Sequence, residues 1–306
     1  MSGKEIELIN KGYDKDLVLK LCNYTEDELD ICVNKAIELL TNNVVNVNSP
    51  KCIFIGGQPG VGKSVLCDKL KRCSNSVEIS MDACRSFHPH YKEIEDTIRN
   101  FYKDKVLSEE INPGHDIAAF TQFFAGKMAN CLIDKISSMN YNIILEWNMR
   151  NSKDVLECMN MLSNKGYKNE ALVLTIDKDK SYEASQIRAN VMESSGLISR
   201  RVNKNFHDIC IDTIPSNVDI IYKVGKDDDI LDNMKVILRD GKVVWNSETD
   251  KILPSVIMNE YYNNKELSNN FVNDPKWAYI AIEKELVGLK LNYDNNVELS
   301  GRKMVA

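Results

Sequence analysis

A glycine-rich motif of eight residues constrains this chain more than any other feature of its sequence. Residues 57–64 read Gly-Gln-Pro-Gly-Val-Gly-Lys-Ser and fit the phosphate-binding P-loop pattern G-x-x-x-x-G-K-[ST]. The apolar run 52–55 precedes the motif, as a buried parallel strand would, and residues 65–70 can begin a helix. Both flanks argue against a chance match to a glycine-rich turn. The motif therefore predicts a strand, a phosphate-binding loop and a helix N-terminus in that order.

The residue types within the motif assign roles to its members. Lys63 is expected to reach the β- and γ-phosphates, and the Ser64 hydroxyl is expected to bind Mg²⁺. The nucleotide would be ATP or GTP. The expected nucleotide-binding residues are Gly57, Gln58, Pro59, Gly60, Val61, Gly62, Lys63 and Ser64.

Size and charge limit the classes of protein that remain. With 306 residues the chain can form one large or two small domains. The formal net charge of -6 argues against a general nucleic-acid-binding surface. No N-terminal apolar segment resembles a signal peptide, and no run of residues is long enough to span a bilayer. We therefore expect no nucleic-acid partner and no membrane association.

The cysteines indicate a reducing compartment. There are nine, an odd number, and no Cys-x-x-Cys pattern occurs. Reduced thiols explain this usage better than disulfides or a zinc site. The expected location is the cytoplasm.

The distribution of patterns along the chain divides it into three parts. Thr25–Glu28 has the sequence of a capping box and leads into an amphipathic helix that should end near Asn42. We expect an N-terminal helical segment and linker over 1–50, a P-loop kinase domain over 51–247 and a C-terminal helical extension over 248–306. The clearest helical pattern of the extension runs from Trp277 to Leu289.

Further strands are predicted at 77–82, 142–146 and 171–176, with a hairpin over 236–245 that turns at Asp240-Gly241. Asn112-Pro113-Gly114 predicts a turn before a long helix with an apolar stripe over 120–139. Strands that alternate with helices predict an α/β fold: a parallel sheet flanked by helices, with helical additions at both ends. The P-loop makes this a P-loop NTPase fold, and its kinase-like type is what the family resemblance given below implies. Ligands of such sheets bind beyond the carboxyl ends of the strands, so Asp82 and Glu146 should meet at the P-loop.

Phosphoryl transfer needs an acceptor, a base and cations beside the transferred group, and the sequence offers candidates for each. Asp82 is the candidate base; its other possible roles are a ligand of a Mg²⁺-bound water or a helix cap. Glu146, Asn148 and Arg150 would point the same way in an extended stretch and could bind one polar substrate. Alternatively, Glu146 is a metal-binding carboxylate and the other two lie on the surface. Arg188 and Arg200 are candidates to stabilise the γ-phosphoryl group, although spacing alone does not separate them from solvated arginines.

Several stretches together resemble the zeta-toxin family, P-loop kinases of UDP-N-acetylglucosamine in bacterial toxin–antitoxin systems. The similarity runs from about Tyr24 to Trp245. The P-loop is generic, whereas the order of the other motifs is more specific. The matching stretches are Gly57–Ser64, Met81–Arg85, His88–Tyr91, Phe124–Met128, Tyr141–Arg150, Ser181-Tyr182 with Arg188, and Arg200 with His207-Asp208.

Carried over to this sequence, the resemblance implies Lys63 as the phosphate-binding lysine and Asp82 as the general base. It implies contacts of Glu146, Asn148 and Arg150 with the sugar nucleotide, and of Arg188 and Arg200 with the transferring phosphate. It also implies a small helical antitoxin that obstructs the nucleotide site.

The sequence departs from the family on the acceptor side. The family's E-G-T-x-R motif reads Glu146-Trp147-Asn148-Met149-Arg150 here, and a family carboxylate aligns with Asn130. The resemblance therefore supports a kinase more firmly than any particular acceptor. A nicotinamide dinucleotide remains an alternative acceptor. A nucleotide-binding protein whose main task is to bind a partner is a second alternative, and a nucleic-acid-dependent ATPase is a weaker third.

Overall fold

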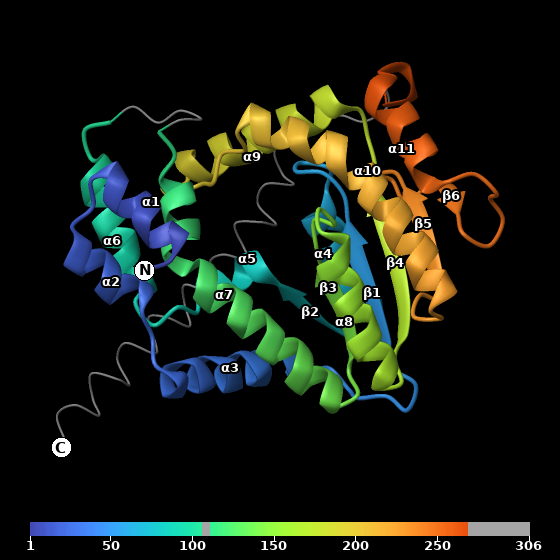
Figure 1. The fold of residues 1–306 in the computed structure, drawn as a ribbon, viewed down its shortest axis with the longest axis horizontal. Coiled ribbons are helices and arrows are strands. Elements are labelled where there is room, and N and C mark those ends of the chain that lie inside the picture. The colour runs from blue at the N-terminus through green and yellow to red at the C-terminus, as the bar shows by residue number, and fades with distance from the viewer. Residues whose placement is uncertain (106–110, 269–306) are drawn as a thin grey trace.

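In the computed structural model, which describes residues 1–105 and 111–268, six strands form one central sheet (Figure 1). The strand order is β2-β3-β1-β4-β5-β6; neighbours among the first five are parallel, and β6 is antiparallel to β5. The strands are β1 (Lys51–Gly56), β2 (Ser76–Ser80), β3 (Asn142–Glu146), β4 (Lys168–Leu174), β5 (Asn233–Ile237) and β6 (Val243–Asn246). The predicted α/β fold of P-loop kinase type is confirmed.

Helices cover both faces of the sheet, because alternate residues of each strand point to opposite sides. One face packs its apolar residues, among them Ile55, against α4 (Lys63–Cys73). The opposite face, with Phe54 at its centre, packs against α3 (Glu26–Thr41), α7 (Pro113–Ser138), α8 (Ser152–Asn164) and α10 (Lys204–Asp227). Figure 1 shows α8 and α10 crossing in front of the strands. The sheet is therefore a rigid base for the loops at its carboxyl edge.

Three predicted elements differ from the structure. The strand expected over 171–176 is β4, which begins at Lys168 and ends at Leu174. The strand expected over 77–82 ends at Ser80, and Asp82 lies in the short helix α5 (Met81–Arg85). Asn112-Pro113-Gly114 does not form a turn, because Pro113 is the first residue of α7. Proline suits that position, because an N–H group in the first turn of a helix has no acceptor within the helix and proline therefore loses no hydrogen bond. The expected strand over 142–146, the hairpin and the capping box at Thr25 are confirmed.

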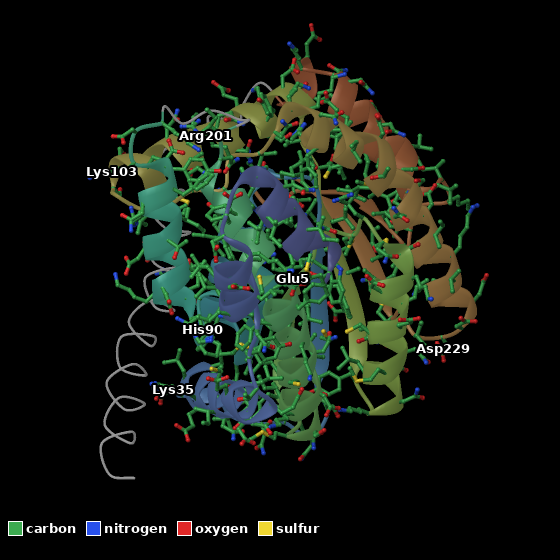
Figure 2. All side chains as sticks on the ribbon, turned by 60° about the vertical axis from the view of Figure 1, so that its left-hand side comes forward. Glu5, Lys35, His90, Lys103, Arg201 and Asp229 are labelled. Atoms are coloured by element: carbon green, nitrogen blue, oxygen red, sulfur yellow. The ribbon has the colours of Figure 1, made fainter. Side chains whose placement is uncertain are left out.

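The N-terminal residues form a second, smaller packing unit. Here α1 (Gly3–Lys11) and α2 (Lys15–Cys22) pack on α6 (Tyr91–Tyr102) and on the first half of α7. Figure 2 shows α1 and α2 on the side of the molecule that faces the viewer. Leu8, Val18 and Leu21 are buried in this unit. The sequence predicted a helical N-terminal segment but not these two helices.

A buried carboxylate connects the unit. Asp116, on α7, is 3% exposed and accepts hydrogen bonds from the hydroxyls of Tyr13 at 2.7 Å and Tyr102 at 2.8 Å. Lys11 donates to the same carboxylate at 2.6 Å. A buried charge is stable only with such partners, so this group joins α1, α6 and α7.

We therefore expect Asp116→Ala to destabilise the protein by about 3 kcal/mol or more, because it leaves three buried or half-buried donors without their acceptor. Asp134 is a matched control on the same helix: it pairs with Lys165 at the same 2.6 Å, but its side chain is 69% exposed. Asp134→Ala should cost at most about 1 kcal/mol. Urea titrations of both variants measure the difference, and equal losses would contradict this interpretation.

The C-terminal part of the described chain joins the main core. After α9 (Lys178–Ser194), α10 and the hairpin comes α11 (Pro254–Asn263), followed by a 3₁₀ turn (Glu266–Ser268). Met258 and Tyr262 of α11 are buried in the same cluster as the sheet. The domain boundary at 247 stays a prediction, and the helix expected from Trp277 to Leu289 lies outside the described residues. In the part of the chain that the structure describes, no helix is both long and apolar enough to cross a membrane.

Candidate active site

The P-loop joins β1 to α4, as the motif predicted. Two of its positions require glycine for close packing as well as for conformation. Gly57 and Gly60 have φ of 131° and 76°, values that favour glycine. A Cβ on Gly60 would lie 1.9 Å from the Ser181 carbonyl oxygen, and one on Gly57 would lie 2.5 Å from that of Leu174. The loop is therefore fitted tightly between β4 and α9.

Lys63 lies in the first turn of α4 and curls back over the loop. Its Nζ donates to the carbonyl oxygens of Gly57 at 2.9 Å and Gln58 at 3.1 Å. Burial lowers the pKa of Lys63 from its ordinary value; Arg188 adds to this lowering, and Glu146 opposes it. The ammonium group thus lies inside the curve of the loop, next to the α4 N-terminus.

Ser64 and Glu146 lie side by side. Glu146 ends β3, opposite Ile55 of β1, and the Ser64 hydroxyl is 3.1 and 3.2 Å from its two carboxylate oxygens. Glu78 of β2 and Cys67 of α4 lie close to Glu146. One potential ligand atom from each of these three residues lies within 4.8 Å of the other two. The oxygen donors of Ser64, Glu146 and Glu78 suit a hard cation such as Mg²⁺. This geometry favours the second interpretation of Glu146, a metal-binding carboxylate.

Asp82 faces the same space from α5 and contacts two arginines. Its carboxylate accepts from Arg85 Nε at 3.1 Å and from an Arg200 amino group at 2.8 Å. Burial alone would raise the pKa of Asp82, but Arg200 and Arg85 outweigh it and hold the pKa well below its usual range. The Asp82 side chain is 59% exposed, so a ligand in the cavity can reach it.

Arg85 is a site residue that the sequence analysis did not select. Its side chain is only 10% exposed, and it also donates to the Ala118 carbonyl at 3.0 Å and to Thr121 Oγ at 3.2 Å, both on α7. It therefore fixes the Asp82 carboxylate to α7. Two signals pointed to it: it lies in the stretch Met81–Arg85 that carries the family resemblance, and it follows Asp82 by three residues, a spacing that brings side chains together only in a helix.

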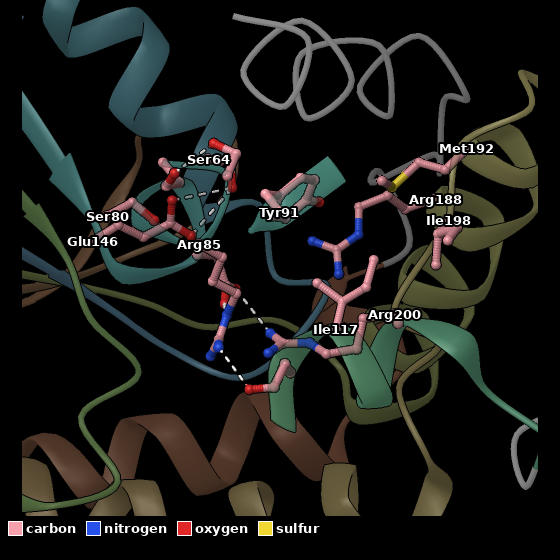
Figure 3. A pocket seen from close by; sticks show the side chains of 15 residues that line it. Ser64, Ser80, Arg85, Tyr91, Ile117, Glu146, Arg188, Met192, Ile198 and Arg200 are labelled. Carbon is pink, nitrogen blue, oxygen red and sulfur yellow. Dashed lines mark hydrogen bonds and ion pairs between the residues drawn. The ribbon is translucent and has the colours of Figure 1, made fainter. Parts of the chain in front are cut away.

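Arg188 and Arg200 reach the cavity from the opposite side, as Figure 3 shows. Arg188 comes from α9, and Arg200 from the segment between α9 and α10. That segment is held against α7: a Cβ on Gly114 would lie 2.3 Å from the Ser199 carbonyl oxygen, and Asn112 Nδ2 donates to the Arg201 carbonyl at 2.7 Å. The Asn-Pro-Gly sequence thus places Arg200 beside Asp82.

One cavity joins these groups. Its lining combines charged and hydroxyl side chains with apolar ones, among them Ile117, Met192 and Ile198. The lining residues are Ser64, Ser80, Asp82, Ala83, Arg85, Ser86, Tyr91, Gly114, Ile117, Ala118, Glu146, Arg188, Met192, Ile198 and Arg200. Five predicted site residues therefore meet there: Ser64, Asp82, Glu146, Arg188 and Arg200.

The structure does not bring Asn148 and Arg150 into this cavity. The extended run expected through Arg150 is wrong, because Met149 has a φ of 54° and turns the chain. Asn148 Oδ1 accepts from the Arg150 N–H at 3.0 Å, and the Arg150 guanidinium lies 4.7 Å from the Phe206 ring centre. Both side chains are exposed. Their contact with an acceptor stays a prediction.

The departures from the family also lie away from the cavity. Trp147 continues the strand pairing by donating its N–H to the Ile55 carbonyl at 2.8 Å, and its ring packs 6.5 Å from that of Phe54. It is partly buried against the main core. Asn130 is exposed on α7. Neither residue lines the cavity.

Comparison with known proteins agrees with the resemblance found in the sequence. A toxin zeta of Streptococcus pyogenes is 26% identical over 249 residues, which is 80% of each chain. Toxin PezT of Streptococcus pneumoniae is also 26% identical, over 79% of this chain and 89% of that protein. A solved structure from the PezAT chromosomal toxin–antitoxin system of S. pneumoniae matches with a TM-score of 0.65 and 24% identity, over 88% of this chain and 98% of the other.

The model of the zeta toxin family matches residues 36–250, a range that includes every residue that lines the cavity. Hence this chain belongs to the zeta toxin family.

Proposed function

We propose that the protein is an ATP-dependent kinase that phosphorylates a hydroxyl group of a nucleotide-linked acceptor, with UDP-N-acetylglucosamine or a related UDP-amino sugar as first choice. The observation that carries the proposal is the position of Asp82, which faces the cavity that Ser64, Arg188 and Arg200 also line. Phosphate-binding loop, carboxylate and cations are the parts that phosphoryl transfer requires. A protein that only bound nucleotide would need no carboxylate at this point.

In this mechanism the acceptor hydroxyl lies against the Asp82 carboxylate and faces the γ-phosphorus. The hydroxyl oxygen forms a bond to that phosphorus while the bond to the bridging oxygen breaks and ADP leaves. The hydroxyl proton passes to a carboxylate oxygen of Asp82 and then to solvent. Arg85 keeps the carboxylate in place through its contacts with α7. Asp82 therefore both orients the acceptor hydroxyl and accepts its proton.

Mg²⁺ would be held by Ser64 and Glu146, whose oxygens are already adjacent. When bound, the cation supplies charge neutralisation of the nucleotide phosphates. The chain's own cations surround the same region: Lys63 lies on the loop, and Arg188 and Arg200 lie across the cavity.

The apolar part of the cavity wall bears on the acceptor. Tyr91, Ile117, Met192 and Ile198 contribute to this wall, and Figure 3 shows Met192 and Ile198 on the side of Arg188, away from Ser64. Such a wall suits a ring of a base or sugar more than a second phosphate. An antitoxin is the proposed protein partner, because the PezAT relative is described as a toxin–antitoxin system.

The direct test is ATP consumption by the purified protein with a panel of UDP-sugars, other nucleotide sugars and nicotinamide dinucleotides. We expect consumption to depend on a UDP-amino sugar. Stimulation by a dinucleotide alone would reassign the acceptor. ATP binding without consumption for any member of the panel would favour the non-catalytic alternative.

A prediction for the two cavity arginines follows from the same mechanism. Arg188→Ala and Arg200→Ala should each lower kcat by about 10³-fold, while the KM for ATP changes much less, because charge on the transferring group develops in the transition state. Arg201→Ala is the matched control: Arg201 pairs with Glu193 and does not line the cavity. Steady-state kinetics measure the three variants. An equal fall in the kcat of Arg201→Ala would show that the activity depends on the order of the segment between α9 and α10 rather than on positive charge in the cavity.

A further inference from the structure

We propose that Arg239, in the turn between β5 and β6, is a positioning residue that holds the P-loop in the shape that binds the polyphosphate of the nucleotide. The inference rests on the proposed function only in requiring that the loop binds nucleotide. Nothing in the sequence pointed to Arg239, because the hairpin lies far along the chain from the loop.

Two hydrogen bonds join the Arg239 side chain to the P-loop backbone. Nε donates to the Val61 carbonyl at 2.9 Å, and one amino group donates to the Gly60 carbonyl. The side chain also lies along Gly62, where a Cβ would be 3.5 Å from Arg239 Cγ. The Arg239 side chain therefore covers one side of the loop at three consecutive residues, Gly60, Val61 and Gly62.

These bonds bear on the donors that phosphate uses. In a trans peptide the carbonyl and the following N–H point in opposite directions. Because Arg239 holds the Val61 carbonyl on its own side, the Gly62 N–H is aimed to the other side. Lys63 holds the carbonyls of Gly57 and Gln58 but not those of Gly60 and Val61. The two cations thus fix different parts of the same loop.

The chemistry of arginine suits this position. Its forked donors can serve two neighbouring carbonyls at once, which a lysine does less well. Arg239 is half-buried, and burial lowers its pKa to about 10, which Glu183 partly opposes, so it remains a cation at neutral pH. A fixed positive charge behind the loop also favours anions on its other side.

The turn that carries Arg239 is itself held in place. Leu238 N–H donates to the Lys242 carbonyl at 2.9 Å, and the Lys242 N–H donates to Asp240 Oδ1 at 2.8 Å. Next in β6, Trp245 is 1% exposed and donates its ring N–H to the Ile252 carbonyl at 2.9 Å. The guanidinium is therefore anchored from the sheet rather than from a loose loop.

Calorimetric titration with ATP and with inorganic tripolyphosphate tests the proposal, because tripolyphosphate occupies only the phosphate-binding loop. Arg239→Ala should weaken both ligands by about tenfold or more, and Arg239→Lys should fall between that variant and the wild type. Lys242→Ala, an exposed cation of the same turn, should bind as the wild type does. Thermal unfolding is measured for each variant.

A purely structural role would lower the thermal midpoint of Arg239→Ala and leave its affinities unchanged at a temperature where it is folded; that result overturns the proposal. Loss of ATP affinity with unchanged tripolyphosphate affinity also overturns it, because the contact would then be to the nucleoside. If Arg239→Ala does not fold, wild-type affinities of Arg239→Lys for both ATP and tripolyphosphate overturn the proposal. A wild type that binds both ligands but transfers no phosphate removes the proposed function and leaves this inference standing.

Discussion

Lys63→Ala should lower phosphoryl transfer by about 10³-fold or more while leaving the fold intact. The variant removes the only side chain of the P-loop that places a cation inside its curve, where Nζ lies within 3.1 Å of two loop carbonyls. Charge that develops between the β- and γ-phosphates would then have no ammonium partner. Turnover with ATP and the true acceptor measures the effect.

The control for this prediction is Lys71→Ala, which removes an exposed lysine from the same helix. It should keep turnover close to that of the wild type, since surface charges contribute little. Both variants should unfold at similar temperatures. Near-normal turnover in a folded Lys63→Ala protein would contradict the role of Lys63 beside the β- and γ-phosphates and, with it, the P-loop as the nucleotide site of the reaction.

Asp82→Asn should reduce kcat by roughly 10²-fold, which is the usual contribution of a general base. Asparagine has almost the same shape but cannot accept the hydroxyl proton, and it cannot pair with Arg85 and Arg200 as an anion. ATP should still bind, because the P-loop is untouched. Steady-state kinetics and ATP titration measure the two effects. The control is Asp96→Asn, an exposed carboxylate on α6 whose pair with Lys92 is 3.5 Å long. Wild-type kcat in Asp82→Asn would reassign the base.

The arginines beside Asp82 also predict a pH dependence. Because they hold its pKa below the ordinary value, the ionised, proton-accepting form persists as the pH falls and is lost only below the usual range for aspartate. The wild type should therefore show no fall in kcat from Asp82 between about pH 6 and pH 4. A fall in that interval that Asp82→Asn lacks would mean that the arginines do not control this carboxylate.

Local patterns predicted the parts of the fold that depend on neighbours in sequence. The P-loop, β3 and the hairpin at Asp240-Gly241 were recognised because glycine positions and apolar runs report directly on backbone conformation. The capping box at Thr25 was recognised for the same reason. The proximity of Asp82 and Glu146 was predicted from a general rule: the carboxyl ends of parallel strands lie at the same edge of the sheet.

The errors arose where tertiary contacts decide. Glu146 was placed in a single run with Asn148 and Arg150, but the positive φ of Met149 breaks that run after the strand pairing of Trp147 ends. No residue type in this run predicts the change of direction, because methionine rarely adopts a positive φ. Asp82 was placed on a strand because Met81 extends the apolar alternation of β2, whereas the pairing with β3 stops at Ser80.

The remaining site features join residues that are distant in sequence. Arg239 contacts Gly60 and Val61, and Gly114 allows the backbone at Ser199 to approach α7. A single sequence contains no signal for such pairs, because arginine and glycine are common at unrelated positions. They became visible only when the sheet brought the hairpin and the helix termini to one edge.

The most direct test of the kinase proposal is mass spectrometry of a bacterial metabolite extract incubated with the protein, Mg²⁺ and ATP labelled in its γ-phosphoryl group. Lys63→Ala protein provides the background. We predict one nucleotide-linked metabolite that gains a single labelled phosphate with the wild type and not with Lys63→Ala. An extract in which no metabolite gains the label, while the wild type binds ATP, would contradict the proposal that this protein is a small-molecule kinase.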